Sequence, residues 1–546
     1  MTAVMEAFEH ALVLVLLVTA LSVVGRRLPW PMPITYVVGA SLIALWPAFP
    51  RVQLDPGFFF LCFVPPLLFS DGWLMPLRDF LSAKRPILTL AIGLVTLTVV
   101  VIGFVAHWLI PGLPLAMAFA LGAVVSPTDA VAVSAITEKL KVPARLNAVL
   151  NGESLMNDAT GLVAFKFALG AMIAGAFSLR AAAMQFVILA CGGLIVGLGV
   201  AFLIGKARDL LRATQRSDEY IEVTISLMTP YAAYLLAETL HVSDILAVVG
   251  AGLYSGWRDP LKMNAETRQT SWAMWSVVLF WLNGLAFVLL GLQMPSILAA
   301  VTNMYSPGQL VLFVAVVSAT AILLRLAWIF PGAYLPFVLF PGALKDETKP
   351  TWQGVLVAGW AGMRGSVTLA AALSIPKLME NGQPFPARDI VIFLALGVIV
   401  VTLMLQGTTL EMLICFLGVK GDGTEAKEER LARIAAVEGG LRALRNEEER
   451  TRSPEESAAL GAVVADYEHR LAELTAAGET QASAHRRRVA TRRYWLIALY
   501  AERAAIDDLW RNDIITDEIH RPLQQLLDHE ERMLDGQSTD APPDSV

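Results

Sequence analysis

The sequence contains little charge for its length. Only 16% of its 546 residues are Asp, Glu, Lys or Arg, whereas a soluble domain carries about 25%. The charge is also uneven: residues 1–418 hold 24 basic and 22 acidic side chains, and residues 419–546 hold 18 and 26. The first 418 residues therefore predict an integral membrane domain, and the excess of negative charge belongs to a soluble tail over residues 419–546.

Cysteine is equally scarce. Cys62, Cys191 and Cys415 lie far apart, each within an apolar run, so neither a disulfide framework nor a metal-ligand spacing is present. We expect all three to be small buried side chains. A nucleotide-binding loop and a catalytic triad are also missing from the sequence. These absences argue against an enzyme, a resident metal or cofactor, and a nucleic-acid partner.

Apolar residues make up 56% of the chain, and many form runs long enough to cross a bilayer, which takes about 20 mostly apolar residues. Thirteen spans are predicted, at residues 11–25, 33–49, 56–75, 86–110, 114–137, 144–174, 182–205, 219–239, 243–257, 272–293, 308–337, 352–376 and 388–417. The predicted fold class is an all-α, multi-pass membrane protein of about 13 transmembrane helices with a soluble helical tail.

Lys and Arg gather in alternate loops between these spans. The richer set of loops contains Arg26, Arg27, Arg78, Lys84, Arg85, Lys139, Lys141, Arg145, Lys206, Arg208, Arg212, Arg216, Arg258, Lys262, Arg268, Lys345 and Lys349; the poorer set contains Arg51, Arg180, Lys377 and Arg388. Because cytoplasmic loops carry the excess of Lys and Arg, this pattern predicts an external N-terminus and a cytoplasmic tail in a bacterial inner membrane. An odd number of spans requires the same crossing.

Two of the predicted spans are interrupted by polar or helix-breaking residues. Ser126-Pro127-Thr128-Asp129 interrupts the fifth span, and Gly359–Ser366, which includes Arg364, interrupts the twelfth. The two spans are seven apart, so spans 1–6 and 8–13 are predicted to be inverted repeats joined by span 7. Paired broken helices at corresponding positions are typical of the binding site of a transporter.

The first interruption supplies oxygen atoms. Pro127 has no N–H group, so the carbonyl of Ala123 loses its helical partner. Together with the Thr128 hydroxyl and the Asp129 carboxylate, this carbonyl predicts a site for a hard cation. In the alternative interpretation the helix is only kinked, and Asp129 caps the half-helix that follows. The two interpretations are compatible.

Residues 151–161 place two carboxylates, Glu153 and Asp158, inside the sixth span, where an ion is costly. Ser154 and Asp158 share one helical face, and Glu153 and Asn157 share another. Asp158 is predicted to be the exchange carboxylate, since such a group holds a proton or a metal ion but hardly both. That competition is sufficient for antiport. Asn157 orients or caps without adding a second titrating charge.

Glu153 is predicted to form a structural ion pair, because a buried carboxylate without a partner is very costly. The candidate partners are Arg325 in the eleventh span and Arg364 in the twelfth. In another interpretation, Arg364 compensates the negative ends of the broken half-helices, as Asp129 compensates their positive ends.

Three further polar residues, Lys166, Asp71 and Asn283, lie within or near the predicted spans. Lys166 either extends outward to the interface, forms another ion pair, or takes part in transport. Asp71, near the inner end of the third span, is either an acid in the cavity or an interfacial charge. Asn283 is interpreted as a polar contact between helices.

Two motifs resemble those of the cation:proton antiporter-1 family of sodium/proton exchangers, particularly its bacterial branch. They are Gly152-Glu153-Ser154-Leu155-Met156-Asn157-Asp158-Ala159 and Ser126-Pro127-Thr128-Asp129-Ala130-Val131-Ala132. The likeness covers about residues 10–418. It implies a thirteen-helix fold with a dimerisation domain, a six-helix core that contains crossed broken helices, and a homodimer that works by an elevator-like movement of the core.

The resemblance also implies roles for individual residues. Asp158 resembles the ion- and proton-carrying carboxylate, Asn157 its partner in electroneutral exchange, and Thr128, Asp129 and Ser154 the surrounding cation site. Glu153 looks like the acid that pairs with an arginine on the eleventh helix, which favours Arg325, and Met363-Arg364-Gly365 resembles the motif on the crossed helix. One departure is that many relatives place an acid where Ser70 stands here, with Asp71 shifted by one residue.

The leading hypothesis is an antiporter that exchanges cytoplasmic Na⁺, or Li⁺ or K⁺, for external H⁺ by alternating access and controls internal pH and sodium. The alternatives are a cation channel and a non-transporting sensor that signals through the tail. In the tail, apolar residues recur at helical spacing, which predicts a small helical bundle; they are Leu431, Ile434, Val437, Leu441 and Leu444, with further amphipathic stretches at 455–475, 486–512 and 517–534.

Overall fold

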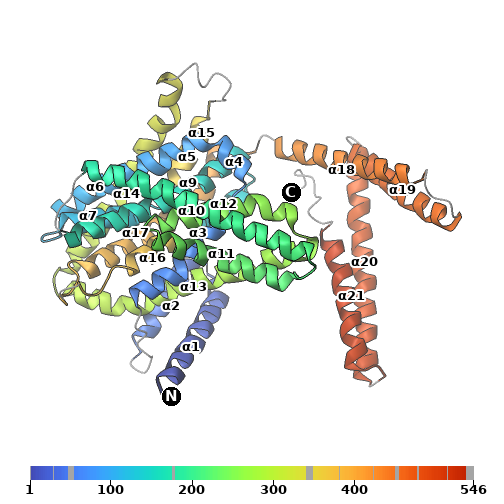
Figure 1. The fold of residues 1–546 in the computed structure, drawn as a ribbon, viewed down its shortest axis with the longest axis horizontal. Helices are drawn as coiled ribbons and strands as arrows, with labels where there is room; N and C mark the ends of the chain where they lie inside the picture. The colour runs from blue at the N-terminus through green and yellow to red at the C-terminus, as the bar shows by residue number, and fades with distance from the viewer. Residues whose placement is uncertain are drawn as a thin grey trace. The chain divides into compact units, whose positions relative to one another are not determined.

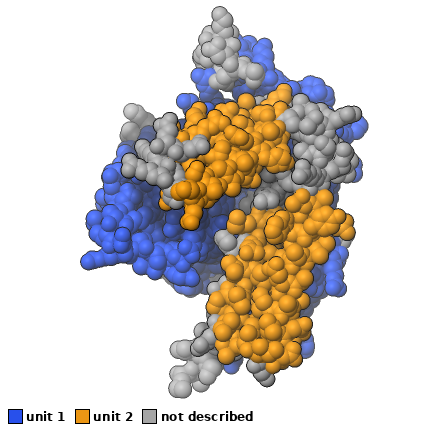
Figure 2. Space-filling model, turned by 90° about the vertical axis from the view of Figure 1, so that its right-hand side faces the viewer, with its two compact units in different colours: residues 1–421 blue, residues 422–546 orange. Residues whose placement is uncertain are grey.

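The computed structural model describes residues 2–28, 30–46, 55–174, 179–339, 349–379, 382–421, 424–448, 454–475, 479–512 and 514–536. Within these residues the regular structure is helical, apart from one isolated bridge between Leu378 and Pro384. The chain divides into two compact units, residues 1–421 and 422–546 (Figure 2).

The first unit is built from helices that follow the predicted apolar runs (Figure 1). In chain order they are α1 Thr2–Gly25, α2 Met32–Ala44, α3 Pro56–Leu74, α4 Leu77–Ser82, α5 Lys84–Leu88, the π-helix η1 Thr89–Leu94, α6 Val95–Leu109, α7 Leu115–Val125, α8 Ala130–Lys139, α9 Ala144–Ala174, α10 Leu179–Ala213, α11 Glu219–Thr239, α12 Asp244–Lys262, α13 Ala265–Thr302, α14 Pro307–Leu339, α15 Trp352–Trp360, α16 Ser366–Leu373 and α17 Arg388–Leu417. The all-α, multi-pass fold class is thereby confirmed.

Length and composition single out six membrane-crossing segments among the described residues: Pro56–Leu74, Lys84–Leu109, Val187–Ala213, Ala265–Thr302, Pro307–Leu339 and Arg388–Leu417. Three shorter apolar helices, Ala11–Gly25, Met32–Ala44 and Leu115–Val125, fall below that length. The total of thirteen spans therefore stays a prediction.

Some expectations differ from the structure. The fourth run, predicted as one span at 86–110, contains a π-helical turn at Thr89–Leu94. The second run stops at Ala44, and residues 47–49 lie outside the described residues, as do Arg51 and Lys345. Cys191 and Cys415 are exposed, so their predicted burial is wrong. The reason is that an apolar membrane helix turns one face to lipid, and burial does not follow from hydrophobicity there.

Helix starts follow from short polar side chains that accept a hydrogen bond from the first turn. The caps are Asp55 on α3, Asp218 on α11, Ser243 on α12, Asn264 on α13 and Thr351 on α15. The sequence therefore fixes these boundaries locally.

The helices pack as two sets that meet at the candidate site. One set contains α3, α10, α11 and α12, with α1, α2 and α13 packed beside it; the other contains α5 to α9 and α14 to α17. Small residues allow close approach within the first set. At Gly197, for example, an added Cβ would lie 1.9 Å from the Ala247 carbonyl oxygen of α12. The short helix α16 contacts α3 and α13 from one set and α7, α9 and α17 from the other.

The described residues of the second unit form four helices, α18 Thr424–Glu448, α19 Pro454–Thr475, α20 Glu479–Arg511 and α21 Asp517–Gly536. Helix α18 packs on α19, and α20 packs on α21 (Figure 1). Arg503 of α20 forms ion pairs of 2.8 Å with both Asp528 and Glu531. His520 bonds to Asp507 at 2.8 Å, and this hydrogen bond holds the pKa of Asp507 below its usual range.

Candidate functional site

Two interrupted helices cross in the first unit, and their unwound segments touch. Helix α7 ends at Val125 and α8 begins at Ala130, while α15 ends at Trp360 and α16 begins at Ser366. The Asp129 N–H donates to the Met363 carbonyl oxygen over 2.7 Å. The polar or helix-breaking residues of the sequence therefore mark a real crossing, in which each break supplies a partner for the other.

Gly365 sits at the closest point of this crossing. A Cβ placed on Gly365 would lie 1.9 Å from the Asp129 Oδ2 atom, far inside contact distance. Because Gly365 is the residue immediately before α16, the Asp129 carboxylate lies at the positive end of that helix, where a negative charge is favoured.

Arg364 serves the opposite ends of the broken helices. Its Nε–H donates to the Val125 carbonyl, at the end of α7, over 3.0 Å, and its Nη1 donates to the Gly362 carbonyl just after α15. The side chain is 2% exposed. The positive guanidinium thus lies at the C-terminal ends of two half-helices, where a positive charge is favoured. Arg364 does not form an ion pair with Glu153, whose partner is Arg325.

Helix α9 holds the first break in place through Ser154 and Asn157. Asn157 Nδ2 donates to the Thr128 hydroxyl over 2.8 Å, and its Oδ1 accepts from the Thr128 N–H over 3.4 Å. Ser154 donates to the Thr128 carbonyl and accepts from the Ala130 N–H over 3.1 Å. The unwound backbone around Thr128 is thus held by two side chains of α9, Ser154 and Asn157, which lie about one helical turn apart.

A small cavity of about 30 Å³ opens at the crossing. Its walls come from α3, α9, α13, α16 and the first break, and its lining residues are Leu67, Asp71, Thr128, Asp129, Ala130, Ser154, Asp158, Leu279, Asn283, Gly365, Ser366, Val367 and Thr368. The polar atoms of the lining side chains are carboxylate, hydroxyl and amide groups. Oxygen ligands of this kind suit hard cations.

Asp158 is the most isolated charge in this lining. Its side chain is 4% exposed, and Oδ1 has no hydrogen-bond partner among the residues that the structure describes. Asp71 and Asp129 line the same cavity from α3 and from the first break. No three His, Cys, Asp or Glu side chains in the described ranges gather as a metal-ligand cluster, so the three carboxylates are spread around the cavity.

Two groups proposed from sequence for the cation site, the Asn157 side chain and the Ala123 carbonyl, lie away from the cavity lining. Asn157 supports the break, and the Ala123 carbonyl accepts from the Ser126 hydroxyl over 2.9 Å, so it is capped locally and does not face the cavity. Ser70 bonds to the Leu67 carbonyl within α3 and does not line the cavity, whereas Asp71 does.

Glu153 pairs with Arg325 of α14. Arg325 Nη2 donates to Glu153 Oε2 over 2.9 Å, and Nη1 donates to the other carboxylate oxygen. Arg325 also donates to the carbonyls of Ala358 and Gly359, at the end of α15. Both charged side chains are at most 2% exposed. The pair therefore joins α9 and α14 to the second broken helix.

Lys166 also forms an ion pair. Its Nζ lies 2.6 Å from Asp244 Oδ2, and the Lys166 side chain is 44% exposed while that of Asp244 is 6% exposed. The ammonium group lies over the rings of Phe60 and Tyr234, at 5.4 and 5.9 Å from their centroids. Lys166 is thus directed at α12, and it does not line the cavity.

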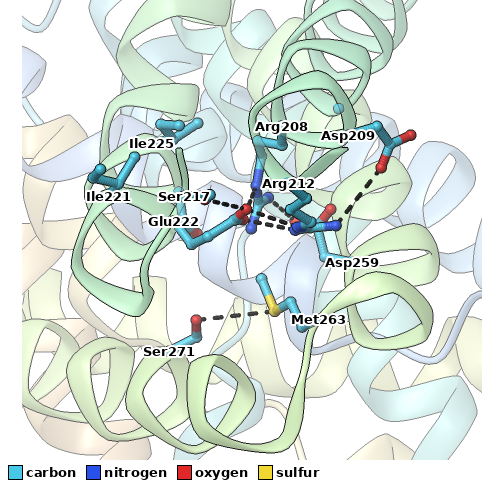
Figure 3. A network of polar contacts seen from close by, with 12 residues as sticks. Arg208, Asp209, Arg212, Ser217, Ile221, Glu222, Ile225, Asp259, Met263 and Ser271 are labelled. Carbon is cyan, nitrogen blue, oxygen red and sulfur yellow. Dashed lines mark hydrogen bonds and ion pairs between the residues drawn. The ribbon is translucent and has the colours of Figure 1, made fainter. Parts of the chain in front are cut away.

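A second buried charged cluster was missed from the sequence (Figure 3). Arg208 of α10 is 2% exposed; its Nε lies 2.6 Å from Glu222 and its Nη1 2.5 Å from Asp259. Arg212 pairs with the same Glu222 at 2.6 Å, and Arg258 pairs with Asp209 at 2.5 Å. The arginines were counted as loop charges, but α10 and α12 extend through them. The acidic partners Glu222 and Asp259 lie on α11 and α12, so the spacing of charges along α10 does not reveal these pairs.

Asn283, Ser366 and Thr368 are cavity residues that sequence reasoning did not assign to the site. Asn283 was interpreted as a contact between helices, yet it lines the cavity from α13. Ser366 and Thr368 follow directly on the second break, in the first turn of α16. Their position after the break was the available signal.

Comparison with known proteins places this geometry in a family. A family model described as "Sodium/hydrogen exchanger, transmembrane" matches residues 12–415. The chain belongs to the sodium/hydrogen exchanger family. The resemblance drawn from the two sequence motifs is thereby confirmed, and the first unit is the transmembrane domain of this family.

Several relatives resemble the chain over most of its length. A Bacillus pumilus protein named "Sodium, potassium, lithium and rubidium/H(+) antiporter" is 39% identical over 75% of this chain and 61% of its own. The Escherichia coli exchanger YjcE is 38% identical over 82% of this chain and 83% of its own. The Mycobacterium tuberculosis exchanger Rv2287 is 33% identical over 96% of both chains, so that likeness includes the tail.

The chain spans about three fifths of the length of the Bacillus pumilus relative and of a similar Bacillus subtilis one. Among solved structures, the sodium proton antiporter MjNhaP1 from Methanocaldococcus jannaschii matches with a TM-score of 0.62 and 18% identity, over 76% of this chain and 99% of that one. This likeness supports the fold of the membrane unit.

Proposed function

We propose that the chain is a secondary active antiporter that exchanges Na⁺, or Li⁺ or K⁺, for H⁺ across the bacterial inner membrane. The observation that carries the proposal is the Asp158 carboxylate, which is buried in an oxygen-lined cavity and has an oxygen without a partner among the described residues. The names of the Bacillus relatives, which list sodium, potassium, lithium and rubidium, support the same class of ions.

In this proposal a cation and a proton compete for Asp158. A buried carboxylate without a fixed cation is tolerable when neutralised by a proton or by a metal ion. Asp129, Thr128 and Ser154 add oxygen atoms around the transported ion, and Asp71 adds a third carboxylate on the α3 wall. Each occupant leaves before the other binds, so the two fluxes are coupled one for one, and the exchange is electroneutral.

The remaining polar residues hold the site. Asn157 and Ser154 fix the first break, Arg364 compensates the carbonyl ends, and Glu153 with Arg325 fixes the second broken helix. Lys166 pairs with Asp244 and takes no part in coordination. The transported ions are the ligands that the protein needs, without a resident cofactor.

The orientation and assembly also belong to the proposal. The loop charges support an external N-terminus and a cytoplasmic tail. The resemblance to the family supports a homodimer in which the set that contains α5 to α9 and α14 to α17 moves against the other set. In the cell, such exchange would control internal pH and sodium.

Purified protein in liposomes that contain a pH-sensitive dye tests this function. A sodium gradient is expected to drive proton flux that does not depend on membrane potential, and Asp158→Asn is expected to abolish it. Asp389→Asn makes the same chemical change at the half-exposed start of α17, so it is expected to leave the flux unchanged. Potential-dependent current without proton exchange would support a channel, and a folded protein without flux would support a sensor.

A further inference from the structure

Thr368 combines burial, a place in the cavity wall and a hydroxyl group without a partner. Its side chain is 1% exposed, and the residue lines the cavity together with Asp158. Its Oγ1 atom makes no hydrogen bond to any residue that the structure describes. A buried hydroxyl without a hydrogen bond costs free energy, so a bound ligand that contacts the Thr368 hydroxyl would be stabilising.

Two buried threonines elsewhere in the unit, Thr229 and Thr402, donate to a carbonyl of their own helix. Thr229 of α11 donates to the Ile225 carbonyl over 2.7 Å, and Thr402 of α17 donates to the Val398 carbonyl over 2.8 Å. This bond to the residue four positions earlier is the ordinary arrangement for a helical threonine.

The break before α16 removes that arrangement for Thr368. The residue four positions earlier is Arg364, which lies in the unwound segment because α16 begins only at Ser366. The Gly365 carbonyl, three positions earlier, already accepts from the Leu369 N–H over 3.3 Å. Thr368 is therefore in a helix but lacks the helical acceptor that a threonine uses.

Two other buried hydroxyls without partners allow a comparison. Thr35 and Ser318 are also unbonded among the described residues, but neither lines the cavity. Only Thr368 and Asp158 among the side chains with unbonded atoms in the described ranges share that wall. Thr368 is on α16, which follows the second break, and Asp158 is on the unbroken helix α9.

We propose that the Thr368 hydroxyl is an oxygen ligand of the transported cation, and that it sets the preference of the site among alkali ions. This inference rests on the proposed antiport function and adds the second broken helix to the ligand set. A hydroxyl adds no charge, so it strengthens cation binding without adding a competing site for the proton. Since the number and strength of oxygen ligands control discrimination between Na⁺ and K⁺, loss of one ligand changes the ranking of ions.

The test compares Thr368→Val, which removes the hydroxyl at nearly constant shape, with Thr368→Ser, which retains it. In liposomes, Thr368→Val is expected to raise the apparent KM for Na⁺ by about tenfold, as for the loss of one bond to a charged group, and to leave the maximal rate near that of the wild type. The ratio of the KM values for Na⁺ and K⁺ is expected to change. Thr368→Ser is expected to restore both quantities.

Thr229→Val is the matched control, because Thr229 is as buried and belongs to α11, outside the cavity lining. It is expected to leave both KM values unchanged. Thermal unfolding of the purified variants with increasing Na⁺ gives a second readout: Thr368→Val should need about tenfold more Na⁺ for the same stabilisation. If that variant unfolds during purification, Thr368→Ala replaces it in both assays.

An unchanged KM and an unchanged ion ranking in Thr368→Val would overturn the inference. So would a fall in maximal rate alone, which indicates an effect on movement. In either case the wild type still exchanges ions, and the antiport function stands. A wild-type protein without cation-driven proton flux would overturn the antiport function and this inference together.

Discussion

Two buried charged clusters in the membrane unit follow opposite rules. In the cluster of Figure 3, Arg208, Glu222 and Asp259 each face an opposite charge within 2.6 Å, and Arg212 joins them. In the cavity, three carboxylates share one space, and an oxygen of Asp158 has no partner among the described residues. Burial alone therefore does not distinguish a structural charge from a functional one.

Pairing makes the distinction. When one partner of a buried ion pair is removed, the remaining charge is left unpaired in a region of low dielectric constant, and the protein is destabilised. A carboxylate that lacks a fixed cation instead has room for an exchangeable one. Substitutions in the paired cluster are therefore expected to change stability, and substitutions in the cavity are expected to change transport.

Arg208→Met is expected to destabilise the protein by about 3–5 kcal/mol, because it leaves Glu222 and Asp259 without their shared guanidinium. Thermal unfolding in detergent measures the loss. Asp158→Asn, which abolishes transport under the proposed function, is expected to unfold at or above the wild-type temperature. Exposed Arg216 provides the control, since Arg216→Met should change stability by no more than about 0.5 kcal/mol.

Exchange per folded molecule is expected to be normal in Arg208→Met. A stable Arg208→Met protein that has lost exchange would contradict the assignment of this cluster to stability alone.

The pair of Glu153 and Arg325 lies beside the cavity but should behave like the cluster of Figure 3. Glu153→Leu and Arg325→Leu are each expected to cost about 3–5 kcal/mol of stability, and the double variant is expected to lose less than their sum by about 0.5–3 kcal/mol. Arg325→Leu should be the worse of the two, since Arg325 also holds two carbonyls of α15. Additive losses in this double-mutant cycle would refute the coupling.

Lys166→Met should have the smallest effect. Because Lys166 is 44% exposed, its pair with Asp244 is expected to contribute at most about 1 kcal/mol. The apparent KM for Na⁺ in liposomes should be that of the wild type, and Lys166→Arg serves as the control that keeps the charge. A several-fold rise in KM for Lys166→Met alone would move Lys166 into the transport site.

The helices and their breaks could be predicted from sequence because they depend on residues that are close together in the chain. Apolar runs and capping residues define the helices one at a time, and Pro127 and Gly365 mark the breaks, so the elements and the position of the crossing follow from short stretches of chain. The family likeness also rests on such short motifs around Asp129 and Asp158. These features need no knowledge of how distant segments meet.

Other features depend on distant contacts. The Arg208 network joins α10, α11 and α12, and the choice of Arg325 as partner of Glu153 depends on how α14 packs on α9. Asp71 faces the cavity while Ser70 bonds within α3, a distinction of one residue that only the rotation of the helix decides. Thr368 escaped notice because its missing acceptor is a property of the break before it.

The contact between Gly365 and Asp129 limits how the site can adapt. Since even a methyl group has no space there, the wall formed by the two breaks is fixed in size. Under the proposed function, a redesign of the site for a larger or smaller alkali ion therefore works from the other walls, through Asp71 on α3, Asn283 on α13 or Thr368 on α16. A side chain added at Gly365 would displace the Asp129 carboxylate and would not simply change the size of the cavity.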